Sequence, residues 1–396
     1  MSSDIYNEKN MQVSQILSEL DIDLWMIWVR ETSQLRDPAL DLLLDGDLVW
    51  QSALLYLQDG SRVAVVGNFD ADGLKEKQLF DRIEPYTKSI KETLIDELKA
   101  VDPSQIALNY SKNDVAADGL TVGMYRSLKE MLRGTDFERR FVSAEDVIAR
   151  LRGRKTQTEL DRIRNAVQIT EKIYSIIRED VRPGQTELEI YDRFHDLMKN
   201  SDVTPAWAAD HCPAVDAGPN KQFGHSGPTK NKTKDGHLLH FDFGVKYFGY
   251  CSDIQRMFFF GKKKDIPDQI ISAFNTVRDA IQTAADKIMP GMKGYEVDTI
   301  ARDYVVDHGY EEYQHALGHQ VGQHAHDGGV LLGPLWERYG DIPKGKVEAG
   351  NVFTLELYVT TEDYGQVSLE EDIVITREGS EFLSTPQKEL ICIERS

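Results

Sequence analysis

The sequence predicts an α+β protein of two domains, and three observations support this prediction. The chain has 396 residues, which is enough for two hydrophobic cores. Strand-like and helix-like segments alternate over residues 1–150. Over residues 151–396, a pattern of helix, Pro-Gly and helix occurs twice, and a strand-rich segment with acidic residues follows each copy. We therefore expect an N-terminal α/β domain over residues 1–150 and a C-terminal domain over residues 151–396 that contains two similar halves.

The elements of the N-terminal domain follow from composition and spacing. Three segments have the apolar and aromatic composition of strands, namely residues 23–30, 52–67 and 105–111. The second contains Gln-Asp-Gly-Ser, which is typical of a hairpin turn. Residues 90–101 and 124–134 have the apolar spacing of helices. No pattern in this domain indicates catalysis.

The C-terminal domain is expected to begin with a long helix. One stripe of this helix carries the apolar side chains Leu160, Ile163, Val167, Tyr174 and Ile177. Thr156 and Glu159 form a capping box at its start. The Pro-Gly pairs at 183–184 and 290–291 mark the same point in each copy of the repeat.

The charge balance argues against a nucleic-acid partner. The chain has 66 acidic and 46 basic residues, and its formal net charge of −20 repels a phosphate backbone. The same balance suits a substrate with a free amino group, although many cytosolic proteins are acidic for solubility alone.

The sequence also indicates the compartment. No apolar run approaches the roughly 20 residues that cross a bilayer, and the polar, acidic residues 1–12 do not form a secretory signal. Cys212, Cys251 and Cys392 are widely spaced, which predicts reduced and mostly buried thiols. We expect a cytoplasmic protein without a membrane partner. An exported protein that lacks its signal is the alternative.

Two acidic residues stand out in the first strand-rich segment. Asp242 and Asp253 lie in strand-like runs on either side of Val-Lys-Tyr-Phe-Gly. If the chain folds back about the midpoint of residues 247 and 248, Asp242 lies directly opposite Asp253. Like charges at opposed positions of a hairpin are destabilising.

A second hairpin repeats this pattern. Folding residues 351–376 about Asp363 places Glu356 opposite Glu370, and Gly365 can supply a positive φ at the turn. Four buried carboxylates are too costly without cations, and two divalent metal ions would neutralise them. If the acids instead lie on unrelated edge strands, they point to solvent and need no metal.

Residues 313–329, the histidine-rich segment, are expected to supply a fifth ligand. This segment contains four of the ten histidines, namely His315, His319, His324 and His326. The spacing of the first two would suit zinc on a helix. However, the glycines at 318, 322, 328 and 329 favour turns over a long helix.

Together, these segments resemble the pita-bread (M24) metallopeptidases, in particular the aminopeptidase P and prolidase branch. The resemblance rests on FDFGVKYFGYCSDIQRMFFFG, HALGHQVGQHAHD, VFTLEL and VSLEEDIVIT, and it covers residues 150–396. It implies a C-terminal pita-bread domain with pseudo-twofold halves. It also implies a creatinase-type N-terminal domain, and through that domain a homodimer.

The resemblance implies specific roles for eight residues. The implied metal ligands are Asp242, Asp253, His319, Glu356 and Glu370. The implied catalytic residues are His225, His326 and Glu356, with Glu356 as general base, and His315 is implied to line the substrate pocket. Four carboxylates and one imidazole favour Mn²⁺, with Co²⁺ or Zn²⁺ as alternatives. A hydroxide shared by the two ions would be the nucleophile.

The expected function is hydrolysis of the Xaa-Pro bond at the N-terminus of peptides or dipeptides, so the expected partner is a peptide with proline at its second position. Two departures from the family pattern bear on this. Leu357-Tyr358 replace the usual Pro-Gly, and Ser368 replaces the usual Arg. One alternative is therefore an enzyme of this fold that acts on a non-peptide substrate, as a creatinase-like amidinohydrolase or a lyase. The other is a metal-free protein that only binds partners.

Overall fold

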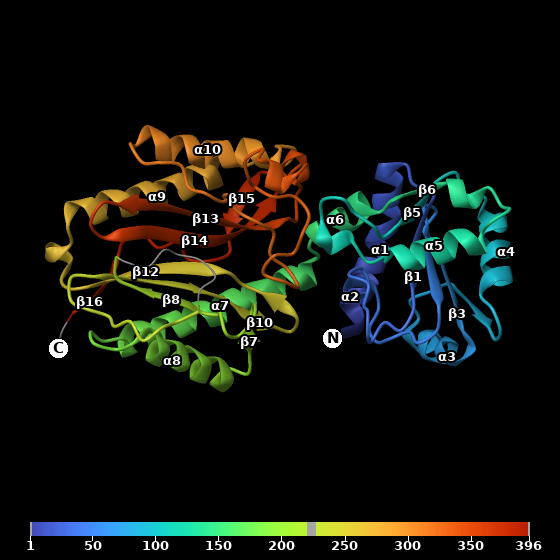
Figure 1. Ribbon diagram of the computed structural model, residues 1–396, viewed down its shortest axis with the longest axis horizontal. Helices are drawn as coiled ribbons and strands as arrows, with labels where there is room; N and C mark the ends of the chain where they lie inside the picture. Colours follow the sequence, from blue (N-terminus) through green and yellow to red (C-terminus); the bar gives the residue numbers. More distant parts are fainter. Residues whose placement is uncertain (1, 220–226, 395–396) are drawn as a thin grey trace. The chain divides into compact units, whose positions relative to one another are not determined.

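The computed structural model describes residues 2–219 and 227–394, and the chain forms two compact units, Met1–Arg152 and Gly153–Ser396 (Figure 1). In the described residues, no helix combines the length and the apolar character that crossing a bilayer requires. Cys212, Cys251 and Cys392 are free thiols, the first two buried, as expected.

The N-terminal unit is built on one mixed sheet with the strand order β4-β3-β2-β1-β5-β6. Its strands are β1 (Leu24–Val29), β2 (Ser52–Leu57), β3 (Arg62–Gly67), β4 (Arg82–Tyr86), β5 (Ile106–Leu108) and β6 (Phe141–Ser143). The predicted hairpin is β2–β3, which pair antiparallel. The pairs β3–β4, β1–β5 and β5–β6 are parallel.

Helices enclose this sheet on both faces. They are α1 (Ser2–Leu20), α2 (Leu40–Leu43), α3 (Asn68–Lys77), α4 (Lys91–Val101), α5 (Val122–Met131) and α6 (Glu145–Gly153). Alternate residues of the fully apolar β1 enter two separate cores, Trp25 and Ile27 in one and Met26 and Trp28 in the other. A strand that is apolar at every position is typical of a sheet that is covered on both sides.

The C-terminal unit contains a larger sheet with the strand order β13-β14-β12-β9-β8. These strands are β8 (Ala214–Ala217), β9 (Leu238–Phe243), β12 (Ile254–Phe260), β13 (Val352–Thr361) and β14 (Gly365–Thr376). The strands β15 (Gly379–Phe382) and β16 (Ile391–Ile393) join β14 and β12. A second, small sheet contains β7 (Thr204–Pro205), β10 (Val245–Tyr247) and β11 (Tyr250–Cys251).

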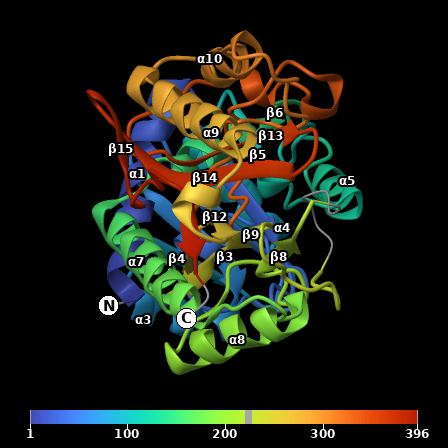
Figure 2. The same ribbon diagram turned by 90° about the vertical axis from the view of Figure 1, so that its left-hand side faces the viewer.

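Two pairs of helices cover this sheet, one pair for each half of the repeat (Figure 2). They are α7 (Gln157–Asp180) and α8 (Glu187–Asn200) in the first half, and α9 (Asp268–Lys287) and α10 (Gly294–Asp307) in the second. The predicted capping box of Thr156 and Glu159 is present at the start of α7. The Pro-Gly pairs lie between the helices of each pair, with Gly184 and Gly291 at φ values of 95° and 94°.

An aromatic cluster joins the first helix pair to the sheet. Tyr174 of α7 and Phe194 of α8 have ring centroids 4.8–6.2 Å from those of Phe241 and Phe243 of β9. The hydroxyl of Tyr174 donates to the carbonyl of Ile254 over 2.7 Å. Burying such rings stabilises the fold through area and edge-to-face contact. The cluster therefore fixes β9 and β12, the strands that adjoin the first acidic pair.

Candidate metal centre

The second acidic pair has the predicted geometry. β13 and β14 form a hairpin in which Glu356 lies directly opposite Glu370. Gly365 has a φ of 79° at the turn, as expected. Since opposed residues point to the same face, both carboxylates lie on one side of the sheet.

The first hairpin has a different register from the predicted one. Asp242 lies opposite Gln255 and not opposite Asp253. The turn residues are Phe248 and Gly249, with φ values of 45° and 83°, as a type I′ turn requires. A positive φ is unusual for phenylalanine, so the sequence favoured a turn centre one residue earlier. The turn centre lies one residue later than predicted, so the residue that faces each position changes by two. A change of two residues keeps both acids on the same face of the sheet.

The histidine-rich segment contains no helix, which confirms the prediction of turns. It runs beside β13, where the Glu356 N–H donates to the Leu317 carbonyl over 2.7 Å and the Thr354 N–H donates to the His319 carbonyl over 2.9 Å. A Cβ added to Gly318 would lie 1.9 Å from the Thr354 carbonyl oxygen. Only glycine permits this approach, which places His319 next to Glu356.

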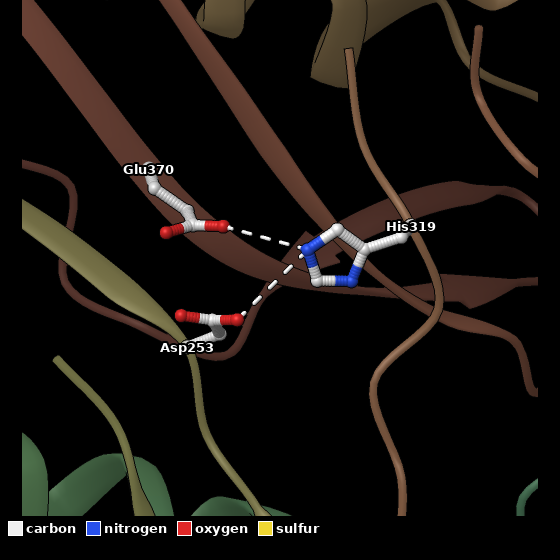
Figure 3. A group of neighbouring side chains, drawn as sticks. All are labelled: Asp253, His319 and Glu370. Atoms are coloured by element: carbon white, nitrogen blue, oxygen red, sulfur yellow. Dashed lines mark ion pairs between the residues drawn. The ribbon is translucent and has the colours of Figure 1, made fainter. Parts of the chain in front are cut away.

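Three carboxylates surround the His319 imidazole. Its Nε2 atom lies 3.6 Å from Glu356 Oε1. The same atom lies 3.9 Å from Asp253 Oδ2 and 4.0 Å from Glu370 Oε1 (Figure 3). One ligand atom each from Asp253, His319 and Glu370 lie within 4.8 Å of one another. These separations exceed hydrogen-bond lengths and match donor atoms that each bind one ion at roughly 2.0–2.2 Å.

Burial raises the pKa values of all four carboxylates, and repulsion from neighbouring carboxylates adds to it at Asp242, Asp253 and Glu370. Burial, opposed by His240 and reinforced by the charge of Glu356, raises the pKa of Asp242 to about 7. Burial raises the pKa of Glu356 to about 7 as well. Burial and the neighbouring carboxylates hold the pKa values of Asp253 and Glu370 well above the usual range.

The donor set fits divalent cations. Burial and the adjacent His326 lower the pKa of His319 to about 3, so its imidazole is neutral at pH 7, as metal binding requires. Asp242 Oδ1 and Glu370 Oε2 are buried without a hydrogen-bond partner. In the part of the chain that the structure describes, no Lys or Arg forms an ion pair with any of the four carboxylates. Such groups are stable as anions only beside a cation.

Comparison with known sequences also supports a metal-binding site. The sequence profile of metallopeptidase family M24 matches residues 161–377. The chain belongs to metallopeptidase family M24. The predicted pita-bread fold of the C-terminal unit is thereby confirmed.

Individual relatives of this metallopeptidase extend the match. A Xaa-Pro dipeptidase from Lactobacillus delbrueckii subsp. lactis is 30% identical over 286 residues, which cover 71% of this chain and 73% of that protein. A Xaa-Pro dipeptidase from Pyrococcus horikoshii is 28% identical over 299 residues, which cover 75% and 80%. The structure of a Xaa-Pro dipeptidase from Bacillus anthracis, 23% identical, superposes with a TM-score of 0.74 over 98% of this chain and 100% of that one. This last likeness shows that the fold is shared along nearly the whole chain.

The other predicted histidines of the metallopeptidase lie in different surroundings. His326 is exposed, and its ring centroid lies 4.1 Å from that of His319. His315 is half-buried with its ring centroid 5.4 Å from that of Tyr358, and burial lowers the pKa of His315. His225 lies outside the described residues. The catalytic and pocket roles of these histidines stay predictions.

A fifth acid of the metallopeptidase was missed in the sequence. Asp372 lies two residues after Glu370 on β14, so it points to the same face. Its Oδ2 atom accepts a hydrogen bond of 3.1 Å from the backbone N–H of Asp253. Burial raises the pKa of Asp372 well above the usual range. The run Glu-Glu-Asp contained the signal, because alternation along a strand places its first and third acids together.

Two buried ion pairs anchor the histidine-rich segment of this metallopeptidase. Asp298 and Arg302 of α10 form a two-pronged pair with distances of 2.7 and 2.9 Å, and Asp298 also accepts from the Leu317 N–H over 3.0 Å. Lys155 and Asp327 form the second pair at 3.0 Å, with side chains 0% and 2% exposed. Paired charges at both ends restrict the loop that carries the imidazole.

Proposed function

We propose that this metallopeptidase uses two divalent ions to hydrolyse the Xaa-Pro bond at the N-terminus of peptides or dipeptides. The observation that carries the proposal is the approach of three carboxylates to within 3.6–4.0 Å of the His319 Nε2 atom. Two relatives named Xaa-Pro dipeptidase, 30% and 28% identical, support the substrate class.

The ligands in this proposal are Asp242, Asp253, His319, Glu356 and Glu370. Two ions bound by them would neutralise the carboxylates, polarise the scissile carbonyl and lower the pKa of a bound water molecule. Glu356, whose Oε1 atom lies 3.6 Å from His319 Nε2 among the candidate ligand atoms, is the group that would accept a proton from that water.

The exposed face of the site is suited to binding a peptide. His326 is exposed beside His319, so its ring can donate a hydrogen bond to the oxyanion of the tetrahedral intermediate. His315 and Tyr358 form an aromatic wall in which the imidazole is held by a contact of 2.7 Å between its Nδ1 atom and the Ala316 carbonyl. Such a wall provides an apolar surface for a proline ring.

The two departures from the family pattern differ in their consequence. Leu357 is fully buried and lies opposite Leu369, so its side chain is in the core and away from the carboxylates. Ser368 lies opposite Tyr358, on the face of the ligands. A serine instead of an arginine there leaves open a non-peptide amide or a lyase substrate, which is the second candidate function.

The test is Mn²⁺-dependent release of the first residue from Xaa-Pro dipeptides and from longer peptides with proline at the second position. We expect release only from metal-loaded protein. Cleavage of neither class would contradict the Xaa-Pro proposal and favour the second candidate. Binding of no metal at all would favour a protein that only binds partners.

Substitution of a ligand tests the metal centre itself. Asp253→Ala is expected to lose activity and bound metal together, as measured by metal analysis of the dialysed protein. Asp363→Ala, in the exposed turn between β13 and β14, is the control and should keep both. Full metal content in Asp253→Ala would show that the ligand assignment is wrong. Manganese as the native metal, the homodimer and the cytoplasmic location stay predictions.

A further inference from the structure

A continuous row of polar side chains crosses the large sheet. Each of its five neighbouring strands contributes one residue, in the order Asp216 (β8), His240 (β9), Gln255 (β12), Ser368 (β14) and Glu356 (β13). The first four are buried, with 2–6% of their surface exposed, and the Glu356 side chain is 21% exposed. Buried polar side chains in the middle of a sheet are stable only where they form hydrogen bonds with one another.

The contacts along the row are continuous. His240 Nδ1 lies 3.0 Å from Asp216 Oδ2. His240 Nε2 lies 3.0 Å from Gln255 Oε1, and Ser368 Oγ lies 2.5 Å from the same oxygen. Gln255 Nε2 then donates to Glu356 Oε2 over 3.2 Å.

The Glu356 carboxylate decides which end of the Gln255 amide faces the metal centre, because only the amide nitrogen can donate to it. An amide oxygen only accepts hydrogen bonds, and an amide nitrogen only donates them. The Ser368 hydroxyl and the His240 ring both converge on Oε1. The NH₂ group therefore points to Glu356, whose carboxylate needs a donor.

The hydrogen bond from the Gln255 amide gives the two Glu356 carboxylate oxygens different roles. Oε1 faces His319 Nε2 at 3.6 Å, in the cluster of candidate ligand atoms. Oε2 is held by Gln255. A carboxylate held in this way offers one oxygen to a metal ion, and its rotation about the terminal bond is restricted.

We propose that Gln255 is a positioning residue for Glu356, held in its orientation by Ser368 and His240. It presents Glu356 to one metal ion as a ligand through a single oxygen. This inference rests on the proposed function in one respect, because it takes Glu356 to be a metal ligand. Hydrogen-bond partners behind a ligand typically change metal affinity by about 10- to 100-fold.

The test is titration of Mn²⁺ into metal-free protein by calorimetry. Gln255→Met keeps the length of the side chain and removes the amide. It should weaken one of the two binding events about 10- to 100-fold and leave the other within about threefold. Ser368→Ala should weaken the same event by less, because His240 still orients the amide. At saturating Mn²⁺, the activity of Gln255→Met should recover.

Gln387→Met is the matched control. Gln387 is similarly buried, 7% against 6% exposed, and also bonds to β12, through the Met257 N–H at 3.0 Å and the Met257 carbonyl at 2.7 Å. Its contacts are with backbone and not with a candidate ligand. We expect a lower unfolding temperature and unchanged affinity for both ions.

Each outcome has a distinct meaning. Unchanged affinity in Gln255→Met overturns the positioning role and leaves the metallopeptidase proposal intact. Equal weakening of both events, matched by the Gln387→Met control, shows a general loss of sheet stability and also overturns it. If the unaltered protein binds no Mn²⁺, both proposals fail together.

Discussion

Removing the metal should make the stability of this protein fall as pH rises from 5 to 8. Asp242 and Glu356 have folded-state pKa values of about 7, against ordinary values of 3.8 and 4.5. A raised pKa of an acid stabilises the fold below the unfolded pKa, and this contribution is lost as pH rises through the folded pKa. Between pH 5 and pH 8 the folded protein must therefore ionise groups that are already ionised in the unfolded chain.

The expected magnitude follows from these pKa values. The ionisation of Asp242 and that of Glu356 each cost about 2–3 kcal/mol of stability over this range when the two groups are treated as independent. Folding lowers the pKa of His319 from 6.5 to about 3, and this shift increases the stability by about 2 kcal/mol over the same range. The net loss is about 3 kcal/mol. Asp253 and Glu370 add to it, since their pKa values are raised further, and the partial exposure of Glu356 reduces it.

The assay is urea unfolding at pH 5, 6, 7 and 8, with chelator and with saturating Mn²⁺. Bound ions offset the repulsion, so the fall should appear only with chelator. The variant Asp253→Asn removes one of the repelling charges, and its metal-free form should be more stable than the unaltered protein at pH 8. A metal-free stability that is constant or rises between pH 5 and pH 8 would refute the reasoning.

Two further predictions concern the loop that carries the imidazole. Lys155→Met removes the cation that lies 3.0 Å from the buried Asp327 carboxylate, and it should destabilise the fold by about 3–5 kcal/mol in urea unfolding. The double variant with Asp327→Leu should recover most of this loss, and no recovery would mean that the charge is not the cause. Gly318→Ala places a Cβ 1.9 Å from the Thr354 carbonyl oxygen, so calorimetry should show weaker Mn²⁺ binding although every ligand is present. Gly73→Ala, on a helix with nothing within 4 Å of the added Cβ, is the control and should stabilise the fold by up to about 1 kcal/mol.

The two hairpins show which strand registers could be predicted from the sequence and which could not. The pairing of Glu356 with Glu370 was predictable because glycine marks the turn and the strands on either side are long and rich in β-branched and other apolar residues. The register at Asp242 was not, because its turn uses a phenylalanine at positive φ. The prediction that both acids lie on one face was still correct, because side chains alternate along a strand and a shift of two residues leaves each on the same face.

The row of polar side chains behind the ligands could not be predicted from the sequence. Asp216, His240 and Gln255 come from three strands, and no spacing relates them along the chain. Only the strand order brings them together. The position of His319 was similarly hidden, because it depends on one glycine that lets a loop lie against β13. Sequence patterns report local geometry, whereas these contacts arise from the packing of distant segments.

The contact between the histidine-rich segment and β13 has a consequence for solubility. β13 is the last strand of its sheet, and backbone groups of residues 317–321 form hydrogen bonds with Val352, Thr354 and Glu356 along this edge. If the segment detaches, unpaired N–H and C=O groups become available for pairing with a second chain. Detachment of the segment would then promote self-association and would also remove His319 from the site.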